Sequence, residues 1–159
     1  MPPKAIETRP RAKKVVKTAP VVVAAAGQRI GAVVGLIQAS DNSSEPLATA
    51  IYFYGSDANR VSNSGIIRGD NAILESNPYG YNSRAFVDNV GSIEGLISLA
   101  QGNDFVRNAG HIVGNVDLGA NADVYDGRLG TIAGTVFGGA GTDMLMGGGG
   151  SDRLDGGDG

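Results

Sequence analysis

A repeating unit in the second half of the chain constrains the fold most. Its pattern is G-x-Φ-x-G-x-Φ, where Φ is an apolar residue, and it begins at Gly91, Gly110 and Gly130, with spacings of 19 and 20 residues. An Asp follows thirteen places after each start, at Asp104, Asp123 and Asp143. Repeats of this length indicate structural units that stack and bury their apolar residues against one another.

Apolar residues alternate with other residues inside each unit, as in Ile112, Val116 and Leu118 or in Ile132 and Val136. This alternation predicts short strands with one buried face, separated by glycine-rich corners. Antiparallel hairpins in a β-sandwich would also give short strands and turns. The near-constant spacing and the phased Asp favour an all-β fold, a parallel β-helix or β-roll solenoid with coils of about 18 to 20 residues.

The solenoid is expected to cover residues 29–137. An earlier unit begins at Gly31, and a weaker one begins at Gly65. Residues 40–62 do not fit the repeat and are expected to form a cap or an inserted hairpin, since a solenoid must protect the open edge of its first coil.

Residues 1–28 form a basic leader that contains Pro2, Pro3, Pro10 and Pro20. Such a segment cannot bury enough apolar surface to order itself, so we expect it to be disordered. The apolar run 21–26 offers a second interpretation, a signal peptide, but it is short and follows a proline.

The charge balance indicates which partners to expect. Seven of the 13 cations but only one of the 16 anions lie in residues 1–29, so the remainder has a net charge of −9 and no Lys. An acidic body argues against nucleic acid and favours a cation as partner. No Cys is present, and no run of 18 apolar residues exists that would span a membrane.

Residues 138–159 read GGAGTDMLM-GGGGSDRLD-GGDG, two nonapeptides and the start of a third. The glycines predict tight turns with positive φ angles, and Asp143 and Asp152 add anionic oxygens. The apolar positions, Leu145 and Leu154, are expected to point inward. Carbonyl and carboxylate oxygens on a flexible loop, without His or Cys, suit Ca²⁺ better than Mg²⁺.

This tandem resembles the repeats-in-toxin (RTX) family, the haemolysin-type calcium-binding proteins that bacteria secrete by the type I route. The resemblance implies an extracellular protein that binds Ca²⁺ through loop carbonyls and Asp carboxylates. The implied ligands are Gly139, Gly141, Asp143, Gly148, Gly150 and Asp152, with Asp123 as a further candidate.

A structural or adhesive module without catalysis of its own is therefore expected, with extracellular polysaccharide as a possible partner. The alternative is the calcium-binding accessory region of a secreted RTX enzyme, such as a protease, a lipase or a polysaccharide-modifying enzyme. A third interpretation, that the solenoid is itself a polysaccharide lyase or epimerase, needs an exposed cluster of carboxylates and cations near Arg84 or Arg107.

The corners of a two-sided roll alternate edges, so Asp104, Asp123 and Asp143 are expected on one edge and Asp152 on the other. Stacked coils lie about 4.8 Å apart. Unit charges at that distance repel by roughly 3 to 4 kcal/mol at an effective dielectric near 20. We expect Ca²⁺ to reverse this repulsion between the Asp123 and Asp143 loops, and between the Asp143 loop and residues 156–159.

Overall fold

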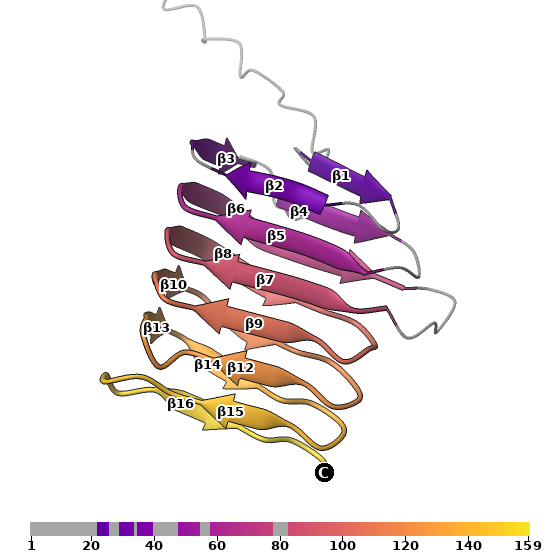
Figure 1. Ribbon diagram of the computed structural model, residues 1–159, viewed down its shortest axis with the longest axis vertical. Coiled ribbons are helices and arrows are strands. Elements are labelled where there is room, and N and C mark those ends of the chain that lie inside the picture. Colours follow the sequence, from indigo (N-terminus) through magenta and orange to yellow (C-terminus); the bar gives the residue numbers. More distant parts are fainter. Residues whose placement is uncertain (1–21, 26–28, 34, 40–47, 55–57, 78–82) are drawn as a thin grey trace, which may run out of the picture.

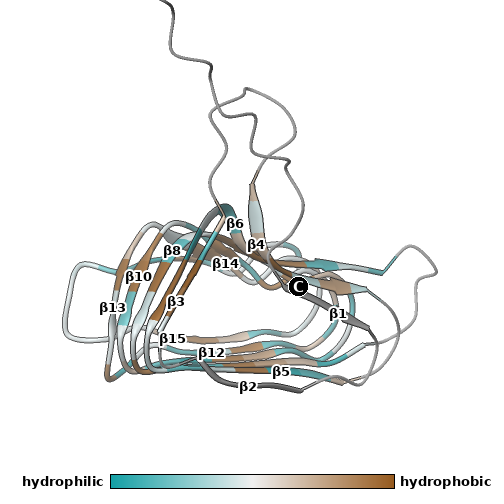
Figure 2. Cartoon of the chain, turned by 90° about the horizontal axis from the view of Figure 1, so that it is seen from above, coloured by the Kyte–Doolittle hydropathy of each residue, from teal (hydrophilic) through white to brown (hydrophobic). Residues whose placement is uncertain are grey.

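The computed structural model describes residues 22–25, 29–33, 35–39, 48–54, 58–77 and 83–159. Every regular element in these ranges is a β-strand, and every pairing between strands is parallel. The chain winds as a β-solenoid in which two sheets face each other (Figures 1 and 2). The predicted fold class is therefore confirmed.

Sheet A has ten strands: β1 (Val22–Ala25), β3 (Leu36–Gln38), β4 (Thr49–Tyr54), β6 (Ile66–Ser76), β8 (Ser92–Ser98), β10 (His111–Val113), β11 (Val116–Asp117), β13 (Thr131–Ala133), β14 (Thr135–Phe137) and β16 (Arg153–Asp155). Sheet B has six strands: β2 (Arg29–Val33), β5 (Asn59–Asn63), β7 (Ala85–Asn89), β9 (Phe105–Asn108), β12 (Val124–Asp126) and β15 (Met144–Met146). Along the chain, each strand of sheet B is preceded and followed by a strand of sheet A.

The second glycine of the repeat unit lies where sheet A bends. Gly95 and Gly114 have φ angles of 125° and 139°, in the region that side chains resist. A Cβ atom on Gly95 would lie 1.8 Å from the carbonyl oxygen of Gly69 in the preceding coil. The repeat therefore needs glycine here because neighbouring coils approach backbone to backbone.

The core consists of columns of inward-pointing residues. Each strand position contributes one residue per coil to its column. Sheet A contributes Ile97, Val116 and Val136 at successive coils, all fully buried. Ile112 and Leu118 are also fully buried and Ile132 is partly buried, as the alternation predicted. The column becomes exposed in the last coil, where Leu154 is 38% accessible.

The structure revises two points of the sequence prediction for the N-terminal coils. Leu36 pairs with Ile66, so the first unit begins at Gly35 and not at Gly31. Residues 49–54 and 59–63 form β4 and β5, which pair in parallel with β6 and β7 as strands of the two sheets, so they do not form an inserted hairpin. Residues 40–47 and 55–57 lie outside the described residues.

The structure describes one segment inside the predicted leader. Val22–Ala25, within the range 1–28, form β1 and pair in parallel with β4, so their backbone continues sheet A. Residues 1–21 and 26–28 lie outside the described residues.

Candidate metal site at the aspartate edge

Asp104, Asp123 and Asp143 form one column along an edge of the solenoid, which we call the aspartate edge. Each carboxylate accepts a hydrogen bond from a backbone N–H of the preceding coil. The Ala85 amide donates to Asp104 Oδ1 at 2.6 Å, the Asp104 amide to Asp123 Oδ1 at 2.7 Å and the Asp123 amide to Asp143 Oδ1 at 3.0 Å. The prediction that these three residues share one edge is confirmed.

The second oxygen of each carboxylate has no partner. The Oδ2 atoms of Asp104, Asp123 and Asp143 are buried without a hydrogen bond. Burial raises the pKa of Asp104 to about 7, although the bond from Ala85 lowers it. Burial likewise raises the pKa of Asp123 to about 6, and the neighbouring Asp143 adds to that rise. The unpartnered Oδ2 atoms favour either protonation of these carboxylates or a cation bound to them.

The first nonapeptide loop, residues 138–143, lies between two other loops of the aspartate edge. Ala140 forms parallel bridges with Ala120 on one side and Asp158 on the other. The Gly141 amide donates to the Asp158 carbonyl at 2.9 Å, and the Asp158 amide donates to the Gly139 carbonyl at 2.7 Å. This places the loop directly against residues 156–159, as the sequence predicted.

The conformation of this loop explains its glycines. Gly139 and Gly141 have φ angles of 99° and 135°. Asn121 is aligned with Gly141 in the preceding coil and has a φ angle of 96°, which Asn tolerates better than most residues. The loop over Asp123 therefore has a conformation similar to that of the first nonapeptide, although it has fewer glycines.

The second nonapeptide loop, residues 147–152, joins β15 to β16 and lies on the opposite edge. The Gly148 amide donates to Asp152 Oδ2 within the same loop at 2.6 Å. Gly148 and Gly150 lack the positive φ angles predicted for them. A Cβ atom at Gly149 or Gly150 would meet no atom within 4 Å, so this loop is open where the first one is stacked.

The structure thus divides the predicted ligands into two sets. Gly139, Gly141 and Asp143 lie on the aspartate edge, next to Asp123, whereas Gly148, Gly150 and Asp152 lie on the other edge. Within the described ranges, no three His, Cys, Asp or Glu side chains converge as metal ligands. A cation at the first loop would therefore depend mostly on backbone carbonyls.

A column of asparagines on the opposite edge, which we call the asparagine edge, was missed from the sequence. Asn63 Nδ2 donates to Asn89 Oδ1 at 2.8 Å, and Asn89 Nδ2 donates to Asn108 Oδ1 at 2.9 Å. All three are buried. The signal was present, because each Asn stands two places before the first glycine of a repeat unit, in NSG, NVG and NAG.

The asparagine column ends at Tyr125. Gly127 occupies the next position, and a Cβ atom there would lie 2.6 Å from Tyr125 Cε1. The Tyr125 ring is buried, and its hydroxyl is hydrogen-bonded to the Asn108 side chain. Burial raises the pKa of Tyr125, and the bond to Asn108 offsets only part of that rise. The tyrosine therefore replaces the missing amide and closes the column with a neutral group.

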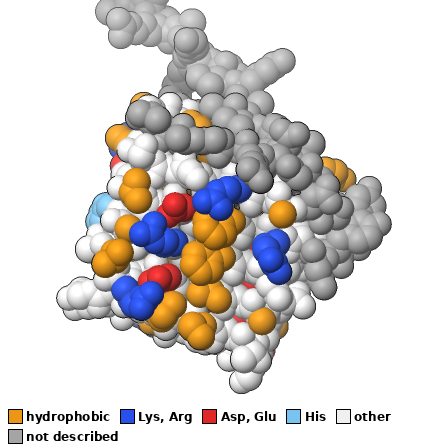
Figure 3. All heavy atoms as spheres, viewed as in Figure 1, with side chains coloured by type: hydrophobic (Ala, Val, Ile, Leu, Met, Phe, Trp, Pro, Cys, Tyr) orange, Lys and Arg blue, Asp and Glu red, His pale blue; other side chains and the backbone are white. Residues whose placement is uncertain are grey.

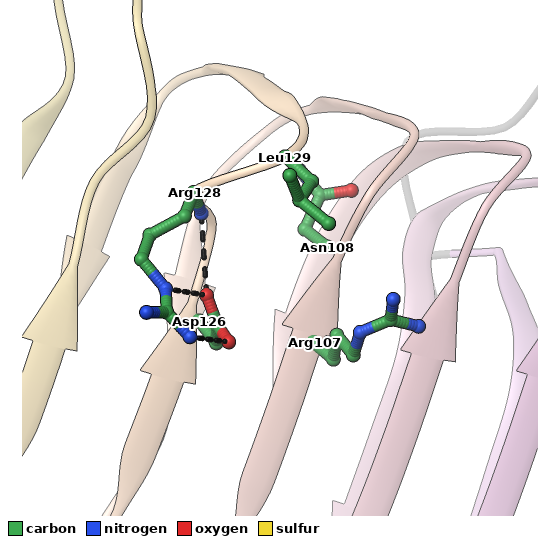
Figure 4. Close-up of a pocket in the computed structure, with 5 residues that line it drawn as sticks. All are labelled: Arg107, Asn108, Asp126, Arg128 and Leu129. Atoms are coloured by element: carbon green, nitrogen blue, oxygen red, sulfur yellow. Dashed lines mark hydrogen bonds and ion pairs between the residues drawn. The ribbon is translucent and has the colours of Figure 1, made fainter.

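The outer face of sheet B carries arginines between apolar side chains (Figure 3). Arg60 stacks on Phe86, and Phe86 stacks on Phe105 with ring centroids 5.0 Å apart. A pocket of about 250 Å³ is lined by Arg107, Asn108, Asp126, Arg128 and Leu129. Figure 4 shows Arg128 folded back onto Asp126, with Arg107 on the adjacent strand. Arg107 Nη1 donates to Asp88 Oδ1 at 2.8 Å.

These features define the class of the protein as a parallel β-solenoid with one carboxylate edge and one amide edge. The chain matches no protein-family model, no curated protein and no solved structure. No helix long and apolar enough to cross a membrane occurs in the described part of the chain.

Proposed function

We propose that the aspartate edge binds Ca²⁺ at the loop 138–143 and that the solenoid is a calcium-stabilised structural module of a secreted protein. The observation that carries this proposal is the unpartnered, buried Oδ2 of Asp143 in a glycine loop stacked between two neighbouring loops. Asp143 would supply the anionic ligand. Carbonyls of the loop, including Gly139 and Gly141, would complete an all-oxygen site of the kind that Ca²⁺ prefers.

The electrostatics of the column support the same function. The carboxylates of Asp104, Asp123 and Asp143 lie at successive coils, and none of them takes part in an ion pair with a described residue. Their ionisation opposes folding, and a divalent cation would reverse that effect and couple binding to stability. The coupling suits a protein that leaves a calcium-poor cell and reaches extracellular calcium.

An adhesive role belongs to the outer face of sheet B. Arg60 stacks on Phe86 at this face, and Arg107 and Arg128, which pair with Asp88 and Asp126, add guanidinium groups to a body whose net charge is negative. Carboxylates of an extracellular polysaccharide are ligands that planar guanidinium groups recognise well. The aspartate edge would then stabilise the fold by binding Ca²⁺, and the outer face of sheet B would contact a partner.

The first experiment compares Asp143→Asn with Asp152→Asn by calorimetric titration of the whole chain with Ca²⁺. For the wild type we expect a dissociation constant of about 10⁻⁴ to 10⁻³ M, the range of extracellular calcium modules. Asp143→Asn should weaken binding at this site by about tenfold or more, because it removes the only anionic ligand of the stacked loop. Asp152→Asn should have a smaller effect, because Asp152 Oδ2 already accepts a hydrogen bond from the Gly148 amide.

Asp88→Asn is the matched control, since Asp88 is paired with Arg107 on the outer face of sheet B. It should bind Ca²⁺ as the wild type does. Equal Ca²⁺ binding by wild type and Asp143→Asn would contradict the proposal, as would the absence of binding by the wild type at about 10-fold above the expected range.

A further inference from the structure

A second group of buried oxygens lies at the N-terminal end of the aspartate edge. In the column of aligned residues, Asn59 is followed by Ala85 and then by Asp104. Glu75, at the end of β6 in the opposite sheet, reaches this corner and accepts a hydrogen bond from Asn59 Nδ2 at 3.2 Å. We call Asn59, Glu75 and Asp104 the corner cluster.

The corner cluster is buried and contains too many acceptors. Asn59, Glu75 and Asp104 are 1%, 4% and 2% exposed. Each keeps one buried oxygen without any hydrogen bond: Asn59 Oδ1, Glu75 Oε2 and Asp104 Oδ2. Orphaned buried oxygens are rare in folded proteins, and three in one corner indicate a missing positive partner.

No described ion pair involves the corner cluster, although the charge of Arg84 acts on Asp104 and lowers its pKa. The described ion pairs are Arg68 with Glu94, Arg107 with Asp88 and Arg128 with Asp126, all with partly exposed side chains. Glu75 raises the pKa of Asp104 more strongly than Asp123 does, although Asp123 is the next residue of the column. The two carboxylates therefore repel each other, and two unpaired buried charges cost several kcal/mol each.

We infer that the corner cluster binds a calcium ion between Glu75 Oε2 and Asp104 Oδ2, with Asn59 Oδ1 as a neutral ligand. Two carboxylates match the charge of a divalent cation, and an all-oxygen set without His or Cys suits a hard ion. The site is independent of the loop 138–143, because Asp104 lies two coils before Asp143 in the column. It would join sheet A to sheet B in the upstream coils.

The test measures the number of Ca²⁺ ions bound per chain by equilibrium dialysis. Glu75→Gln keeps the acceptor for Asn59 but removes one of the two charges, so it should bind one ion fewer than the wild type. Asp104→Asn should lose the same ion. Asp88→Asn, on the outer face, should keep the wild-type number.

Urea unfolding in Ca²⁺ and in EDTA separates a lost ion from a lost fold. Glu75→Gln should unfold in EDTA at the same or a higher urea concentration than the wild type, but should gain less from Ca²⁺. If Glu75→Gln does not fold, Asp104→Asn gives the same comparison. Full Ca²⁺ stoichiometry in both variants would overturn the inference and leave a shared proton as the partner of the two carboxylates.

The double variant Glu75→Gln/Asp143→Asn distinguishes this inference from the proposed function. Loss of one ion in Glu75→Gln, with no loss in Asp143→Asn, would support the corner cluster and contradict calcium at the loop. The opposite result would overturn the corner cluster alone. Loss of two ions in the double variant supports both sites.

Discussion

The two edges of the solenoid solve the same problem with different chemistry. Each edge must satisfy backbone and side-chain groups where the chain turns between sheets. On the asparagine edge, each amide donates to the next, so that Asn63, Asn89 and Asn108 form a continuous chain of bonds. On the aspartate edge, Asp104 and Asp123 accept from backbone amides and leave one oxygen each without a partner.

The difference comes from the donor count of the side chain. An amide has donors and an acceptor, so a column of amides can repeat along the stack without outside help. A carboxylate only accepts, so a column of carboxylates needs protons or cations to complete it. The asparagine edge is therefore self-sufficient, whereas the stability of the aspartate edge depends on its ligands and on pH.

The largest loss of stability is expected from Asn89→Asp, which puts a carboxylate in the asparagine edge. The ionised carboxylate of this variant cannot donate to Asn108 Oδ1, now 2.9 Å from Asn89 Nδ2. Two facing acceptors would remain buried, at a cost of about 3 kcal/mol or more at a pH of about 8. Protonation at a pH of about 4 should recover part of that loss. Urea unfolding at the two pH values measures it.

Asn115→Asp is the control for this prediction. Asn115 is exposed between β10 and β11, and its Oδ1 accepts from the Thr135 amide at 3.0 Å, a bond that Asp would retain. Its effect should stay within about 0.5 kcal/mol. A loss below about 1 kcal/mol for Asn89→Asp, independent of pH, would mean that the amide column contributes little.

The next effect is the pH dependence of the wild type in EDTA. The pKa of Asp104 is raised to about 7 and that of Asp123 to about 6, so the folded state binds more protons than the unfolded state above a pH of about 4. The free energy of unfolding should therefore fall as pH rises from about 4 to 7, by on the order of 6 kcal/mol.

Asp104→Asn should flatten this pH profile by about half, because its neutral amide does not titrate in this range. The same profile measured in Ca²⁺ should be flatter for the wild type, since the cation favours the ionised carboxylates. Stability that rises with pH in EDTA would show that the buried carboxylates are not the dominant titrating groups.

The smallest effect compares the glycines of the two nonapeptide loops. A Cβ atom on Gly141, whose φ angle is 135°, would lie 2.0 Å from the Asn121 carbonyl oxygen. Gly141→Ala should cost about 1 to 3 kcal/mol. Gly150→Ala meets no atom within 4 Å and should change stability by less than about 0.5 kcal/mol. Equal losses would show that both loops are stacked in solution.

Several features were predictable because the repeat is periodic. The spacing of Gly91, Gly110 and Gly130 predicted the coil length, and alternation predicted the burial of Ile112, Val116 and Val136. The thirteen-residue offset predicted one column for the three aspartates. Each of these depends on local spacing, which the sequence contains directly.

The N-terminal coils were harder to predict because their repeat is interrupted. Gly31 fits the start of a unit, whereas Gly35 has Ala39 in place of the second glycine, and only the pairing of Leu36 with Ile66 selects Gly35. Likewise, residues 48–54 lack the glycine pattern but form β4, because their apolar side chains complete the core beside β6. Contacts between neighbouring coils therefore decide where the first unit begins and which residues form β4.

The sequence by itself determined the solenoid, the coil length and the edge on which each Asp lies, because these follow from period and phase. Only the tertiary structure decided that Asp104 and Asp123 turn inward, and that Glu75 from the opposite sheet meets Asp104 in one corner. A corner residue can face solvent or the interior with the same spacing. The choice depends on the backbone amides of the adjacent coil, which only folding brings within hydrogen-bond distance.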